Sequence, residues 1–214
     1  MNLFLRAKHW QIFLLTFGLP FVFQIIMMIN IFSSILNRQG KPVVMLGYFK
    51  FFPLMMVVFM GALFGWMWSV AMGLQKTLPA GVTMKTTQFK IFFFIPLVYI
   101  CLFSFFITSV MSSFMSGSFL HGGQPDMTIF YFFPIIFPLH LFAMFCIFYC
   151  LYFVAKTIKT AELQKEATFS DFVGEFFLIW FHFIGIWILQ PRINKLVEQY
   201  KGDLPVVGDN INKG

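Results

Sequence analysis

The sequence predicts an all-α membrane protein, a polytopic bundle of transmembrane helices. Of its 214 residues, 59% are apolar, 21% are aromatic and only 11% are charged. Soluble domains carry about 25% charged residues, so this chain lacks the polar surface that a water-soluble fold needs. The apolar residues also gather in runs of about 20, the length that an α-helix needs to cross a bilayer core of about 30 Å.

The chain begins with a short mixed segment, residues 1–10, in which Arg6 and Lys8 stand among apolar side chains. This pattern is typical of a helix that lies in the membrane interface. Residues 11–35 follow as the first predicted span. Because Pro20 removes a backbone donor inside that span, we expect a kink there.

Three further spans are predicted from the apolar runs that follow, with polar connections between them. The connection after the second span is rich in lysine, whereas the one after the third has neither lysine nor arginine. A fifth apolar segment and a polar C-terminal tail complete the chain. We therefore expect a membrane domain over residues 1–196, with spans at about 48–74, 91–114 and 127–155, a fifth segment at 172–190, and a tail at 197–214.

Basic residues bear on the path of the fifth segment, because short cytoplasmic loops are enriched in lysine and arginine. If the N-terminus is cytoplasmic and all five segments cross, eight basic residues lie inside and seven outside. If the fifth segment enters and returns to the same face, the counts become twelve and three. The returning path fits the charge rule better, with Gly185 as a flexible midpoint and Pro191 as the end of a half-helix. A crossing path stays open, because a helix over this segment would measure about 28 Å.

Four small residues recur at every fourth position of the second predicted span: Gly61, Gly65, Ser69 and Gly73. They line one helical face. Small side chains let another backbone approach closely, which is how helices pack where lipid removes the hydrophobic driving force. We predict a helix-packing seam, within the chain or between subunits. A sliding surface for a moving helix is the functional alternative.

Two histidines, His140 and His182, lie near the middles of the fourth and fifth apolar segments. Ionisable groups inside a membrane are candidate functional groups, because placing them there is costly. Three interpretations are open: neutral imidazoles hydrogen-bonded to neighbouring helices, a proton relay or substrate contact, and ligation of a haem or metal.

Glu175 completes the candidate intramembrane polar site. It lies four residues after Asp171 and seven before His182, so these three side chains can share one helical face. A proton path between carboxylate and imidazole is one interpretation. The simpler one is that Ser170 or Asp171 caps the segment and that an acid in the first turn suits the helix dipole.

The connection at residues 156–171 is charged, and the helical spacing of Lys159, Glu162 and Glu166 predicts a solvated helical extension. A docking site for a cytoplasmic partner is the alternative. The sequence contains no phosphate-binding loop, zinc-type ligand spacing or serine-hydrolase motif, and no basic cluster of the kind that binds nucleic acid. We therefore expect no enzyme activity, no metal centre, no cofactor and no nucleic-acid partner.

Three stretches of the sequence are similar to an uncharacterised family of small polytopic membrane proteins of bacteria: AKHWQIFLLTFGLPF, GWMWSVAMGLQKTLP with FKIFFFIPLVYI, and FCIFYCLYFVAKTIKTAELQKEATFSDFVGEFFLIW with GIWILQPRIN. The resemblance implies a bacterial inner-membrane protein and no particular activity. The opening also loosely resembles that of ABC-2-type permeases, in which an amphipathic elbow precedes the first span. Such permeases usually have six spans, whereas this chain offers four or five.

These observations favour a non-enzymatic accessory or permease-like component of a membrane transport system, with its N-terminus in the cytoplasm. Two alternatives stay open: an intramembrane redox, metal-binding or haem-binding protein that uses His140 and His182, and a structural membrane protein that assembles through the small-residue seam. The expected partners, besides the lipid bilayer, are a second copy of the chain or other membrane and cytoplasmic subunits.

Overall fold

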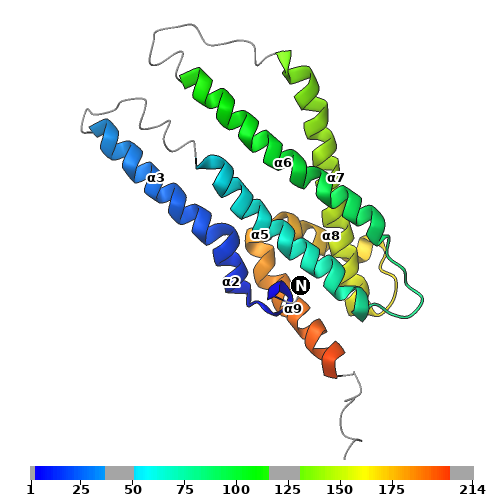
Figure 1. Ribbon diagram of the computed structural model, residues 1–214. Helices are drawn as coiled ribbons and strands as arrows, with labels where there is room; N and C mark the ends of the chain where they lie inside the picture. The colour runs from blue at the N-terminus through cyan, green and yellow to red at the C-terminus, as the bar shows by residue number, and fades with distance from the viewer. Residues whose placement is uncertain (1–2, 37–50, 116–130, 203–214) are drawn as a thin grey trace, which may run out of the picture.

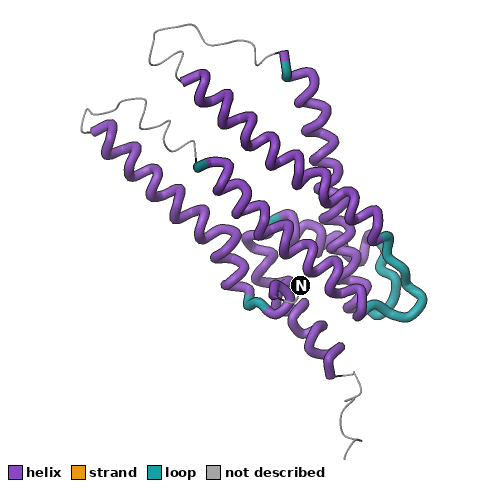
Figure 2. Tube along the Cα trace, in the orientation of Figure 1, coloured by secondary structure: helices purple, strands orange, loops and turns teal. Residues whose placement is uncertain are grey.

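The computed structural model describes residues 3–36, 51–115 and 131–202 and confirms the all-α class, because these residues form helices and short connections without a β-strand. Four helical stretches are long and apolar enough to cross a membrane, so the chain is a multi-pass membrane protein. They run side by side in Figure 1, and the other helices gather at the end where the N-terminus lies (Figures 1 and 2). The four stretches are His9–Ser33, Pro53–Thr77, Thr86–Val110 and Phe133–Leu163.

The N-terminal segment forms two short helices instead of one interfacial helix. Lys8 adopts an extended conformation (φ −75°, ψ 150°) and separates α1 from α2. The irregularity expected at Pro20 lies just before it, as a π-helical turn that links α2 to α3. Proline cannot donate a hydrogen bond to the carbonyl four residues earlier, which fits a widened turn at this point. The elements are α1 (Leu3–Arg6), α2 (His9–Phe13), η1 (Leu14–Gly18) and α3 (Leu19–Leu36).

The packed centre of the bundle consists of α5, α6 and α7, which contact one another in all three pairs. Aromatic side chains fill it, with the rings of Phe89 and Phe153 stacked 4.6 Å apart and those of Phe64 and Phe93 edge to face at 5.2 Å. The predicted starts of the second and fourth spans, at residues 48 and 127, lie outside the described residues. The bounds are α5 (Phe52–Gly73), η2 (Leu74–Thr77), α6 (Thr86–Met115) and α7 (Phe133–Leu163).

The fourth span continues as a helix beyond residue 155, as predicted, but this extension is not solvated, because Thr157, Ile158, Thr160 and Ala161 are buried. It ends at Leu163, and Gln164 closes it in the left-handed conformation (φ 51°). Large apolar side chains cover the outward faces of the spans, with Phe21 65% and Leu102 66% exposed. Exposure of so many large apolar side chains is the arrangement expected of a surface that faces lipid.

The fifth apolar segment folds back on itself as a helical hairpin. Phe181 (φ −87°, ψ 55°) interrupts the helix and separates α8 (Phe169–Trp180) from α9 (His182–Gly202). With its 12 residues, α8 is about 18 Å long, too short to cross a membrane. Figure 1 shows α9 returning to the end of the bundle where α8 begins. This hairpin is the geometry that the returning path requires, whereas the crossing path would need one unbroken helix over the segment.

Two details of that path differ from the sequence-based expectation. Gly185 is not the break; it is the point of closest approach between the two arms, where a Cβ atom would collide with the backbone carbonyl of Leu178. Glycine is needed there because the arms cross backbone to backbone. Pro191 does not end a half-helix either, because α9 continues through it.

Candidate functional site

Four charged side chains from α7, α8 and α9 meet where the hairpin returns. The Nε and Nη2 atoms of Arg192 donate to the two carboxylate oxygens of Glu162 at 2.7 and 2.6 Å, and Nη2 also donates to Glu175 at 2.6 Å. Lys159 Nζ lies 3.2 Å from Glu175 and 3.5 Å from Glu162. We call these four residues the charge cluster.

The charge cluster ties both arms of the hairpin to the fourth span, since Glu162 lies on α7, Glu175 on α8 and Arg192 on α9. Glu175 is buried, and a buried carboxylate must be paired and hydrogen-bonded to stay charged. The hydrogen bond to Glu162, and secondly that to Glu175, raises the pKa of Arg192 above its usual value, although partial burial opposes the shift. Two acids and two bases leave the cluster without net charge.

The start of α8 is capped by Thr168 together with Asp171, one of the two residues expected to cap it, whereas Ser170 is not the N-cap. Thr168 is the N-cap, and Asp171 accepts hydrogen bonds from its backbone N–H at 2.8 Å and its hydroxyl at 2.7 Å. Ser170 lies inside the first turn. The hydrogen bond from the Thr168 hydroxyl lowers the pKa of the Asp171 carboxyl. This reciprocal arrangement satisfies donors that the first helical turn leaves free.

A buried glutamine fastens the N-terminal helices to the bundle. The indole N–H of Trp66 donates to Gln190 Oε1 at 2.8 Å, and Gln190 Nε2 donates to the backbone carbonyls of Phe4 at 2.8 Å and Ala7 at 3.0 Å. Gln190 is fully buried. One side chain of α9 therefore satisfies one carbonyl within α1 and one just beyond it, and links them to α5.

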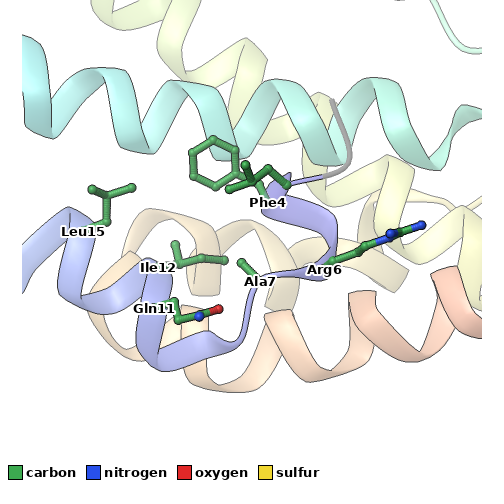
Figure 3. A pocket seen from close by; sticks show the side chains of 7 residues that line it. Phe4, Arg6, Ala7, Gln11, Ile12 and Leu15 are labelled. Atoms are coloured by element: carbon green, nitrogen blue, oxygen red, sulfur yellow. The ribbon is translucent and has the colours of Figure 1, made fainter.

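The small-residue seam of α5 receives α1, a helix of the same chain. A Cβ atom on Gly65 would lie 3.0 Å from the ring of Phe4, and one on Gly73 would collide with Leu5, whereas one on Gly61 would meet nothing within 4 Å. Ser69 is buried between them. Figure 3 shows Phe4 beneath α5, with Arg6 pointing away. A groove of ≈ 720 Å³ borders α1 and α2 here.

His182 lies at the tip of the hairpin, 4% exposed, with its ring 4.8 Å from that of Trp66 in an edge-to-face arrangement and 6.1 Å from that of Phe17. Neither ring nitrogen has a hydrogen-bond partner among the described residues. Leaving a buried polar group unpaired costs about 1–3 kcal/mol. Among the described residues, His182 therefore lacks the hydrogen bond to a neighbouring helix that one interpretation of the sequence expected.

A half-open cavity of ≈ 380 Å³ lies beside His182, bordered by η1, α5, α7 and the hairpin tip; we call it the hairpin cavity. Its walls are aromatic and aliphatic, and His182 and Trp180 are the lining side chains that carry nitrogen. Representative lining residues are Phe17, Leu63, Met67, Phe148 and Ile179.

His140 has different surroundings, between α6 and α7. Its Nδ1 atom lies 2.9 Å from the hydroxyl of Tyr99, and its ring also lies beside that of Phe103. This contact is the interhelical hydrogen bond that one interpretation of the sequence expected. His140 is exposed on the outside of the bundle.

The structure does not bring His140, Glu175 and His182 together. Glu175 belongs to the charge cluster, His182 lines the hairpin cavity, and His140 pairs with Tyr99. The expected face shared by Asp171, Glu175 and His182 fails because the helix breaks before His182. Among the described residues, no group of three or more His, Cys, Asp or Glu side chains is arranged to hold a metal ion.

Two residues that position the site were not singled out from the sequence. Gln190 and Arg192 belong to the tripeptide Gln-Pro-Arg at the end of the apolar run, where they look like the start of a polar tail. A polar residue directly after an apolar segment is ordinary for both a crossing and a returning path. Their contacts with α1, α7 and α8 follow only from the hairpin.

Comparison with known proteins adds no relative, because no protein-family profile, curated protein or solved structure matches this chain.

Proposed function

We propose that the chain is a non-enzymatic, permease-like component of a membrane transport system, residing in a bacterial inner membrane. The observation that carries this proposal is the half-length hairpin, whose tip ends in a cavity between the spans. Interrupted helices at membrane depth are stable where protein buries them or where they line a cavity, and in transport proteins such segments form binding sites.

The distribution of charge supports a cytoplasmic location for the hairpin end of the bundle. This end holds the N-terminal helices, the connection between α5 and α6, the connection between α7 and α8, and the later part of α9. Positive residues concentrate on the cytoplasmic side of membrane proteins. The basic residues described at this end are Arg6, Lys8, Lys76, Lys85, Lys90, Lys156, Lys159, Lys165, Arg192 and Lys195.

The geometry gives less support to the other two functions considered. A haem or metal held jointly by His140 and His182 would require facing imidazoles, and the two rings have separate surroundings. Assembly through the small-residue seam would require a free seam, and α1 occupies most of its length.

The proposal is tested by isolating the chain from its native membrane in a mild detergent. We expect a stoichiometric complex with another transport subunit, in particular a cytoplasmic ATPase. Charge reversal at the exposed Lys85 and Lys90 should reduce the recovered partner, whereas a substitution of the exposed Tyr131 at the opposite end should not. A chain that purifies alone, under conditions that keep other multisubunit transporters intact, would refute the proposal.

A further inference from the structure

We propose that the groove beside α1 and α2 binds one anionic phospholipid, whose phosphate pairs with Arg6 and whose acyl chains lie along the apolar side chains of the groove. Its volume is ≈ 720 Å³, and residues of α1, α2, η1 and the link between α1 and α2 line it; we call it the N-terminal groove. This inference does not rest on the proposed transport function, because the binding concerns this chain and the surrounding bilayer alone.

The N-terminal groove has a charged end and an apolar end. Figure 3 shows Arg6 and Leu15 at opposite ends of the lining residues, with Gln11 between them and the side chain of Arg6 extending outward. Leu15 belongs to the first of the four stretches that can cross a membrane, His9–Ser33, whereas Arg6 precedes that stretch. A phospholipid in a bilayer has the same order, because its headgroup lies outside the hydrocarbon core that holds its acyl chains.

The polar groups of the groove are hydrogen-bond donors. Gln11 Oε1 accepts from the backbone N–H of Lys8 at 2.9 Å, which leaves the amide N–H groups of Gln11 for a ligand. The backbone carbonyls of Phe4 and Ala7 already accept from Gln190 Nε2, at 2.8 and 3.0 Å. The guanidinium adds five N–H donors and no acceptor, and guanidinium groups pair well with phosphate. A ligand of this groove must therefore supply acceptors, as phosphate oxygens do.

The charge of Arg6 is uncompensated within the part of the chain that the structure describes. The ion pairs found there join Lys156, Lys159 and Arg192 to glutamates, and none includes Arg6 or Lys8. Both side chains are exposed, and no acidic side chain lines the groove. An anionic headgroup therefore finds an available guanidinium, whereas the ammonium group of a zwitterionic lipid finds no carboxylate.

The apolar part of the groove distinguishes a lipid from a soluble anion. Leu3, Phe4, Ile12 and Leu15 line it with hydrocarbon, and Leu3 and Leu15 are 80% and 39% exposed. A soluble phosphate would pair with the guanidinium and leave this apolar surface uncovered. Acyl chains would cover it, so the groove favours an anion that carries hydrocarbon.

The test measures the binding of single phospholipids to the purified full chain by native mass spectrometry in detergent. Phosphatidylglycerol and phosphatidylcholine with identical acyl chains are titrated separately, so that only the headgroup differs. We expect one phosphatidylglycerol to bind at least about fivefold more tightly than phosphatidylcholine, because one basic residue near a membrane surface contributes about 1 kcal/mol toward anionic lipid. Glycerol 1-phosphate in excess, which has the charge without the chains, should not displace the phosphatidylglycerol.

Four variants assign the binding to the groove. Arg6→Gln should weaken phosphatidylglycerol about fivefold and phosphatidylcholine less than about twofold, whereas Arg6→Lys, which keeps the charge, should retain most of the preference. Lys165→Gln removes the same charge from an exposed residue that does not line the groove, and it should leave both affinities unchanged. Leu15→Asn should weaken both lipids equally, because it alters the apolar end alone. Unchanged helix content by circular dichroism shows that each variant is folded.

Three results would overturn the inference. Equal affinity for phosphatidylglycerol and phosphatidylcholine, or equal effects of Arg6→Gln and Lys165→Gln, would mean that Arg6 does not select the headgroup. Displacement of the lipid by glycerol 1-phosphate would mean that the groove takes a soluble phosphate. None of these results depends on whether the chain is recovered with a transport partner, so this inference and the proposed function can fail separately.

Discussion

Replacing Arg192 by methionine tests whether the charge cluster holds the hairpin in place. The substitution removes three hydrogen bonds, at 2.7, 2.6 and 2.6 Å, and leaves the carboxylates of Glu162 and Glu175 with Lys159 as their shared cation. Methionine preserves much of the apolar stem of the side chain, so the change isolates the loss of the guanidinium.

The expected destabilisation is about 2–4 kcal/mol. Hydrogen bonds to charged groups contribute about 1.5–3 kcal/mol each, which would set an upper limit of roughly 4.5–9 kcal/mol for three. The true cost is smaller, because the side chain of Arg192 is 31% exposed and Lys159 continues to compensate the carboxylates. Breaking a fully buried pair costs about 3–5 kcal/mol, so a partly exposed one should lie at or below that range.

The assay is reversible unfolding of the purified chain in mixed micelles, from which the free energy of unfolding is obtained. Glu166→Gln is the matched control, because it breaks the single ion pair with Lys156, at 2.8 Å, whose carboxylate side chain is 66% exposed. An exposed pair of this kind contributes little to stability, because solvent screens the two charges. Equal destabilisation by Arg192→Met and Glu166→Gln would refute the view that the charge cluster locks the hairpin.

Three further predictions follow from single contacts. Gly185→Ala should destabilise the chain by more than about 2 kcal/mol in the same assay, because the added Cβ atom would collide with a backbone carbonyl. Gly174→Ala, where the added Cβ atom would meet open space, should stabilise the chain by about 0.5–1 kcal/mol. Similar effects of the two substitutions would contradict the close crossing of the two arms. Gln190→Leu should release the N-terminal helices and speed their cleavage in limited proteolysis, and an unchanged cleavage rate would show that this amide does not fasten them. The pKa of Asp171 is lowered in the folded protein, so its hydrogen bonds from Thr168 stabilise the fold at pH values above the pKa of a free aspartate and are lost as the pH falls through the folded-state pKa. The difference in stability between wild type and Asp171→Asn should therefore shrink below about pH 4. A difference that does not change with pH would argue against the cap.

Hydropathy and charge predicted the arrangement of the membrane spans, because the thickness of the bilayer and the preference of basic residues for the cytoplasmic side constrain any membrane protein in the same way. The four spans follow from apolar length, and the distribution of lysine and arginine favours the returning path, with which the hairpin geometry agrees. The seam of Gly61, Gly65, Ser69 and Gly73 also predicted a close helix contact, although it could not show that α1 is the helix that fills it.

The site was less predictable because it depends on where one helix breaks. Placing the break at Gly185 was reasonable from intrinsic flexibility, but the chain turns at Phe181 and uses Gly185 for close packing. That shift separates Glu175 from His182, since α8 and α9 do not continue one helical face. The pairing of Arg192 with Glu162 joins side chains from two different helices, and no local pattern in the sequence signals it.

Site-directed labelling of single cysteines in intact cells tests the returning hairpin most directly, in a background with Cys101, Cys146 and Cys150 replaced. Lys165→Cys and Lys195→Cys lie before and after the hairpin, and both positions are exposed. The account predicts that a membrane-impermeant maleimide labels neither from outside the cell and both after the cytoplasmic face is opened. Labelling of Lys195→Cys from outside, with Lys165→Cys still protected, would show that the segment crosses the membrane and would contradict the account.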